Sequence, residues 1–126
     1  MIKRASVTGE FLGWFHFRPG HGSDDITHIE LGYRLHRSAW HKGYATEGSR
    51  ALVSMGFTGL GVERVFALTM TVNTASRHVL EKCGLALVRT TPYEGPDIIE
   101  GAEHGKVEYA LTKPEWEART AGDTRN

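Results

Sequence analysis

Apolar and polar positions alternate along two stretches near the start of the chain, and this pattern predicts strands. Residues 10–17 are rich in aromatic side chains, whereas residues 27–35 alternate in part, with one face formed by Ile29, Leu31, Tyr33 and Leu35. The residues between them, 18–25, contain a proline and two glycines and are expected to turn. We therefore predict an antiparallel hairpin.

The spacing of apolar residues changes after this hairpin and predicts a helix that starts at Gly43 or Tyr44 and ends near Thr58. Its core-facing stripe is expected to consist of Gly48, Ala51, Leu52 and Met55. Residues 63–71 are almost continuously apolar, which is typical of a strand buried on both faces, as in a parallel pair. Strand, helix and strand then form a right-handed crossover.

The second half of the chain predicts one more helix and two strands. The helix covers residues 73–83, begins at a cap formed by Asn73 or Thr74, and is stopped by Gly84. Residues 85–91 and 106–112 are expected to pair antiparallel around a loop rich in glycine, proline and glutamate. Residues 114–117 predict a helical turn, and the polar residues 118–126 a frayed tail. The fold class is α/β (α+β) with a mixed, largely antiparallel sheet.

The bulk properties of the chain narrow the classes of function. With 126 residues it is expected to form a single domain, over residues 1–117, without disulfides or metals. Its 15 basic and 15 acidic residues balance, which argues against broad nucleic-acid binding. The single cysteine, Cys83, favours a reducing, cytoplasmic setting. Neither a signal peptide nor an apolar run of membrane-spanning length is visible.

The segment Lys42-Gly43-Tyr44-Ala45-Thr46 is a candidate anion site, because it turns from a loop into a helix around a glycine. The first backbone N–H groups of a helix have no partner within it, and the helix dipole adds partial positive charge there. A pyrophosphate fits such a place, and His41 stands next to it in the sequence. The alternative is an ordinary helix opened by a glycine.

A second strand-to-helix turn carries the polar pair Asn73 and Ser76. An anion cradle and a polar pair on successive turns of this kind suggest a phosphate-bearing cofactor that lies across the sheet. The structural alternative is that Asn73 only caps the helix and Ser76 is an ordinary serine of its first turn.

Together these motifs resemble the GNAT superfamily of acyl-CoA-dependent N-acetyltransferases, in the branch of the ribosomal-protein N-terminal acetyltransferases. The resemblance rests on residues 30–35, 40–47 and 73–84 and extends from about Gly9 to Trp116. Trp40 stands where the family pattern has Gln or Arg. The resemblance implies that the two central parallel strands splay apart, with acetyl-CoA in the gap between them.

The resemblance also implies roles for single residues. Glu30 would be the base that takes the proton of the amine, often through water, and Ser76 the acid that protonates the departing thiolate. The alternative for Glu30 is a solvated carboxylate on the open face of the sheet. Glu100 and Glu103 are rival bases, and Tyr109 is a rival acid. The cofactor would contact Leu35, His41, Lys42, Gly43, Tyr44, Ala45, Thr46, Asn73 and Ser76. The amine would attack the thioester directly, and no metal ligands are expected, since the seven histidines are scattered.

The resemblance begins part-way into the family's usual domain, after the strand and two helices that form much of the acceptor side. A second chain supplying that wall, a misplaced start, or a domain that binds acyl-CoA without turnover are the competing explanations. We expect a homodimer or larger homo-oligomer that acetylates a small-molecule or peptide amine. The alternative is a non-catalytic acyl-CoA-binding or interaction module.

Overall fold

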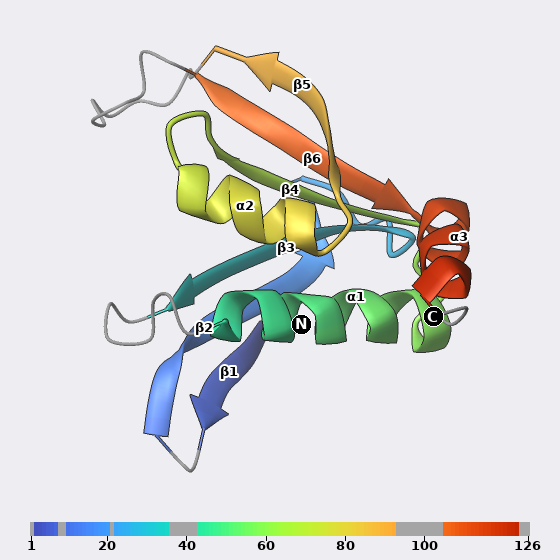
Figure 1. Ribbon diagram of the computed structural model, residues 1–126, viewed down its shortest axis with the longest axis horizontal. Coiled ribbons are helices and arrows are strands. Elements are labelled where there is room, and N and C mark those ends of the chain that lie inside the picture. The colour runs from blue at the N-terminus through green and yellow to red at the C-terminus, as the bar shows by residue number, and fades with distance from the viewer. Residues whose placement is uncertain (1, 8–9, 21, 36–42, 93–104, 124–126) are drawn as a thin grey trace.

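The computed structural model describes residues 2–7, 10–20, 22–35, 43–92 and 105–123. Six strands form one mixed sheet in the order β1-β2-β3-β4-β6-β5, with helices α1 and α2 packed on one face of it (Figure 1). The expected mixed and largely antiparallel sheet is thereby confirmed. Within the described part of the chain, no helix has both the length and the apolar character needed to cross a membrane.

The first three strands form an antiparallel meander: β1 (Ile2–Val7), β2 (Glu10–Pro19) and β3 (His28–Leu35). The predicted hairpin of β2 and β3 is confirmed, but β2 runs on through Arg18 and Pro19, which we had assigned to the turn. β1 was not predicted, because its six residues carry no clear alternation. It is a strand because the open edge of β2 supplies its hydrogen-bond partners.

The crossover unit is also confirmed, with α1 at Tyr44–Gly59 and β4 at Arg64–Met70. β3 and β4 run parallel, but they pair over only three residue pairs, from His28 with Arg64 to Glu30 with Phe66. Beyond these pairs the two strands no longer face each other as hydrogen-bond partners, although each continues for several residues. The central strands therefore splay apart, as expected.

The stripe predicted for α1 is confirmed except at one position. Leu52 is buried and Met55 packs half-buried against the core, whereas Ala51 is exposed. The other buried residues of the helix are Ser49, Val53, Gly56 and Phe57. A side chain at Gly48 would collide with the ring of Phe15, and one at Gly56 with the ring of Phe17. These two glycines let α1 lie close to β2, which rotates the buried face of the helix away from Ala51.

β4 is not buried on both faces, so that prediction was wrong. Val65 and Ala67 are buried under the helices, whereas Leu68 is 44% exposed and Phe66 half-buried on the opposite face. The physical reason is that both helices α1 and α2 pack on one face of the sheet (Figure 1). Among the described residues, no helix covers the other face, which we call the open face.

The C-terminal half contains α2 (Thr74–Lys82), β5 (Ala86–Thr91), β6 (Lys106–Thr112) and α3 (Lys113–Asp123). The antiparallel pairing of β5 with β6 is confirmed. α3 continues to Asp123, so the predicted single turn and the frayed tail from residue 118 were both misplaced. A capping box explains its start: the backbone N–H of Thr112 donates to Oε1 of Glu115 over 2.9 Å, and the Thr112 hydroxyl does so over 2.8 Å.

Candidate active site

The splay between β3 and β4 opens a cavity of about 890 Å³. Its walls come from β2, the second half of β3, the start of α1, β4 and most of α2. The backbone edges of β3 and β4 that face this cavity do not pair with each other beyond Glu30 and Phe66. Unpaired backbone groups need partners, so the cavity presents a polar, extended edge to any chain-like ligand.

Gly43 forms one end of this cavity and is the N-cap of α1, with a φ of 79°. Glycine adopts this left-handed conformation without the steric cost of a side chain. Among the described residues, no side chain caps the first N–H groups of the helix, those of Tyr44, Ala45 and Thr46. The predicted helix start is confirmed, and these N–H groups lie at the cavity. Lys42, His41 and Trp40 lie outside the described residues.

A smaller pocket of about 400 Å³ also reaches Gly43. It is lined by Thr46, Glu47, Arg50 and Lys82 as well as Gly43. The Arg50 guanidinium donates to the backbone oxygen of Lys82 over 2.9 Å, which ties α1 to the end of α2. The two side chains Arg50 and Lys82 bring positive charge to the end of the site that offers free N–H groups.

Asn73 is the N-cap of α2, and its side-chain oxygen accepts a hydrogen bond from the Ser76 backbone N–H over 3.1 Å. The capping role that the sequence suggested for Asn73 is thereby confirmed. Both residues also line the cavity, together with Thr74 and Ala75 between them. The start of α2 therefore presents an amide and a hydroxyl to the same space as Gly43.

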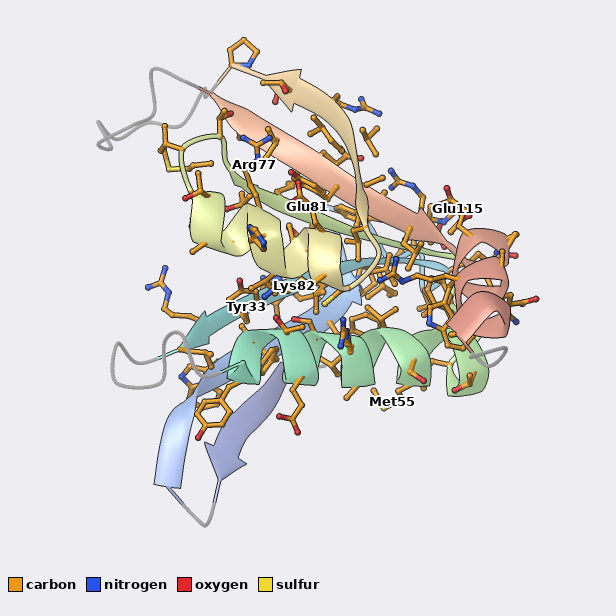
Figure 2. The ribbon with its side chains drawn as sticks, viewed as in Figure 1. Tyr33, Met55, Arg77, Glu81, Lys82 and Glu115 are labelled. Carbon is orange, nitrogen blue, oxygen red and sulfur yellow. The ribbon has the colours of Figure 1, made fainter. Side chains whose placement is uncertain are left out.

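Tyr33 approaches Ser76 from the opposite wall. It lies on β3, packs against Phe15 with 5.8 Å between ring centroids, and lines the cavity between α1 and α2 (Figure 2). Burial raises the pKa of its hydroxyl, and a hydrogen bond with the Ser76 side chain partly offsets that rise. Sequence analysis placed Tyr33 in the core stripe of its strand. The signal that it belongs to the site was its hydroxyl on an otherwise apolar face.

Glu30 lies on the open face of β3, half-buried, opposite Arg18 on β2 and Phe66 on β4. Leu31 to Leu35 line the cavity, but Glu30 does not. The structure thus brings Leu35, Gly43 to Thr46, Asn73 and Ser76 together around one space and leaves Glu30 beside it. The rival bases Glu100 and Glu103 lie outside the described residues.

Tyr109, the rival acid, is 1% exposed on β6 and is occupied elsewhere. Its hydroxyl donates to Oε2 of Glu81 over 2.9 Å and accepts from Nε of Arg77 over 3.1 Å. Arg77 and Glu81 both project from α2 toward β6 (Figure 2). Tyr109 does not line the cavity, and its hydrogen bonds hold α2 on the sheet.

Cys83 is 6% exposed and packs in the core, as expected for a structural cysteine. Burial raises the pKa of its thiol to about 11, so the thiol stays protonated and is a poor nucleophile at neutral pH. Its Sγ donates to the backbone oxygen of Thr46 over 3.7 Å, which links the end of α2 to the start of α1. Among the described residues, no group of His, Cys, Asp or Glu has the geometry of a metal site.

Two parallel strands splay apart here, and the starts of α1 and α2 line the cavity between them. This arrangement matches a known domain. The acetyltransferase (GNAT) domain family matches residues 2–86 of the chain. This protein belongs to the GNAT family. The predicted family is thereby confirmed from the region that forms most of the cavity.

One curated relative of this GNAT domain is named for acetyl transfer from coenzyme A. FsC-acetyl coenzyme A-N(2)-transacetylase of Aspergillus fumigatus is 38% identical over 115 residues, which cover 86% of this chain and 48% of that protein. The chain spans about half the length of the curated relatives it matches.

Solved structures show the same fold. A GNAT acetyltransferase from Bacillus anthracis is 27% identical, with a TM-score of 0.69 over 90% of this chain and 66% of that chain. The ribosomal L7/L12 α-N-protein acetyltransferase RimL, solved in complex with coenzyme A, is 18% identical, with a TM-score of 0.74 over 88% of this chain and 60% of that chain.

Proposed function

We propose that this GNAT domain transfers the acetyl group of acetyl-CoA to a primary amine. The observation that carries the proposal is the single cavity that holds the bare N-terminus of α1, the unpaired edges of β3 and β4, and the Ser76 hydroxyl. From one end of the cavity to the other, these groups match the pyrophosphate, the pantetheine arm and the thioester of acetyl-CoA. The relatives named above support the same chemistry.

The residues present fit the cofactor along its length. The N–H groups of Tyr44, Ala45 and Thr46 would hold the pyrophosphate, with Lys42 and His41 adding positive charge or hydrogen bonds. The unpaired edges of β3 and β4 would bind the amides of the pantetheine arm in the manner of an added strand. Asn73 and Leu35, which line the cavity, would contact that arm.

Bound acetyl-CoA supplies an activated acetyl group, and the chain supplies position and proton transfer. Holding the thioester between the strands beside an amine makes the attack effectively intramolecular. A backbone N–H at the splay would hydrogen-bond the thioester oxygen as charge develops on it. Ser76 would protonate the departing thiolate, with Tyr33 orienting its hydroxyl. Glu30 would draw off the amine proton through an intermediate group, since it does not line the cavity.

The deciding experiment is calorimetric titration with acetyl-CoA, with adenosine as the control ligand, followed by a turnover assay that follows thiol release. We expect binding near 1 μM, which corresponds to about −8 kcal/mol. The amine panel is spermidine, kanamycin and a peptide with a free α-amine. Binding without turnover of any amine would favour the alternative, a non-catalytic acyl-CoA-binding module. A folded sample that does not bind acetyl-CoA would overturn both.

Replacing Ser76 with alanine tests the acid. We expect kcat to fall by about 10- to 100-fold, because general acid catalysis typically contributes 10²–10⁴-fold and a thiolate is already a fair leaving group. The dissociation constant for acetyl-CoA should change little, because the Ser76→Ala variant keeps the backbone N–H that donates to the Asn73 side-chain oxygen. The start of α2 therefore keeps its cap. Thr74→Ala is the matched control, because it removes a hydroxyl two residues before Ser76 at the start of the same helix. Equal kcat values for Ser76→Ala and the parent would remove Ser76 from the chemistry.

The finer features of the acceptor, the assembly and the location are part of this proposal. The resemblance to the ribosomal-protein branch favours a peptide α-amine, so the peptide should give the highest kcat/KM in the panel.

The open face, with Leu68 exposed and Phe66 half-buried, favours a homodimer in which a second copy covers it. Light scattering at micromolar concentration should give twice the mass of the chain, and a monomer mass would refute this. We propose the cytoplasm as the location, which fits the buried, unpaired thiol of Cys83.

A further inference from the structure

His16 holds an unusual position beside the cavity. It lies on β2 directly opposite Gly32 of β3, on the open face of the sheet. A Cβ atom at residue 32 would collide with the imidazole ring, at Cε1 first and then at the two ring nitrogens. The ring therefore crosses over Gly32, with its far edge directed across β3 toward the splay. Only a glycine at position 32 leaves room for this arrangement.

The Nε2 atom of His16 is buried and has no hydrogen-bond partner in the described structure. Leaving a buried polar atom unpaired costs free energy, so a partner at this atom is favoured. His16 lines the same cavity as Gly32 and Leu68, on the open-face side of the gap. Ser76 lines that cavity from α2, which packs on the helix-covered face. The His16 imidazole and the Ser76 hydroxyl thus line the cavity between β3 and β4 from opposite faces of the sheet.

The charges around His16 suit a base. Burial lowers the pKa of His16 below its ordinary value of 6.5, the negative charge of Glu30 offsets part of that fall, and Arg18 adds to it. Arg34 also lies on this face of β3, two positions beyond Gly32, and is exposed. A neutral imidazole at neutral pH keeps one nitrogen free to accept a proton. Glu30 then stabilises the imidazolium that forms.

We propose that His16 is the general base of the reaction, taking the proton of the acceptor ammonium on Nε2, with Glu30 acting behind it as a positioning residue. This inference rests on the proposed function and fills the gap that Glu30 leaves by not lining the cavity. It requires the imidazole tautomer that carries its proton on Nδ1.

The proton balance of the step is complete. The ammonium gives one proton to Nε2 of His16, and the free amine forms a bond to the thioester carbon. The C–S bond breaks, the thiolate takes the Ser76 proton, and the amide nitrogen returns a proton to Ser76. The imidazolium of His16 releases its proton to solvent. Acetyl-CoA and the ammonium thus become the amide, free CoA and one proton.

The test is steady-state acetylation of the best amine of the panel by the parent, His16→Ala and Gly32→Ala, across pH 5 to 9. We expect kcat/KM for the amine to fall about 100-fold in His16→Ala, the lower range for general base catalysis. Added imidazole should restore much of that rate, and the acid limb of the parental pH profile, below pH 6.5, should vanish. Calorimetric affinity for acetyl-CoA should stay within about threefold of the parent.

Gly32→Ala keeps the histidine but displaces its ring, so it should lose rate by a similar factor without rescue by imidazole. His28→Gln is the matched control, because His28 is an exposed histidine on β3 outside the cavity, and it should keep the parental rate. A folded His16→Ala variant with parental kcat/KM, or one that imidazole does not rescue, overturns the role of His16 alone. A parent that acetylates no amine overturns the proposed function and this inference together.

Discussion

Replacing Gly43 with glutamate should weaken acetyl-CoA binding at least about 100-fold in a calorimetric titration. Gly43 caps α1 with a φ of 79° at the end of the cavity, beside the N–H groups proposed to hold the pyrophosphate. A carboxylate there would face the phosphates. Two like charges about 4 Å apart near a protein surface repel by about 4 kcal/mol before screening by salt. A 100-fold loss corresponds to about 2.8 kcal/mol, so the repulsion suffices even when salt screens part of it, and a side chain that fills the cradle adds to the loss.

The matched control is Gly61→Glu. Gly61 has a φ of 73° and follows the opposite end of α1. As at Gly43, an added Cβ there has no atom of the described residues within 4 Å apart from its chain neighbours. Both variants therefore carry the same charge and a similar backbone strain of about 1–2 kcal/mol. Only Gly43→Glu should lose acetyl-CoA affinity. Unchanged affinity in folded Gly43→Glu would show that the start of α1 is not the phosphate site.

Replacing Phe57 with alanine should lower the free energy of unfolding by about 3–5 kcal/mol, as for other buried phenylalanines. Phe57 is 1% exposed near the end of α1, and its ring lies 5.4 Å from that of Trp116 on α3. The substitution leaves a cavity where α1, α3 and the sheet meet. For a domain whose whole stability is about 5–15 kcal/mol, this is a large share, and urea unfolding followed by circular dichroism measures it.

Leu60→Ala is the control for this second prediction, because Leu60 closes the same helix but is 46% exposed. It should cost less than about 1 kcal/mol, since little apolar area leaves the core. A Phe57→Ala variant as stable as Leu60→Ala would mean that α3 does not pack on α1 in solution.

Much of the fold was predictable because it depends on neighbours in the sequence. Alternation between residues 27 and 35, the change to helical spacing after Gly43, and the cap at Asn73 are local patterns, and the structure confirms all three. The candidate anion site at the start of α1 belongs to this class, since a glycine and the helix it opens are adjacent in the chain. The same adjacency makes the GNAT resemblance visible in the sequence alone.

Errors arose where an element's surroundings decide its burial. The apolar run in β4 looked like a doubly buried strand, yet Leu68 is exposed because the two flanking helices pack on the same face. On α1, Ala51 was assigned to the core-facing stripe but is exposed, because Gly48 and Gly56 pack against the rings of Phe15 and Phe17 and so fix which side of the helix is buried. Which rings these glycines meet depends on β2 and not on the helix itself.

The sequence by itself determined most of the strands and helices and the starts of α1 at Gly43 and of α2 at Asn73, because these follow from contacts within a few residues. Only the tertiary structure decided which side chains share the cavity. It placed Tyr33 against Ser76, kept Glu30 off the lining, and laid His16 over Gly32. Those pairings join strands and helices far apart in the chain, and their geometry depends on where β3 and β4 stop pairing.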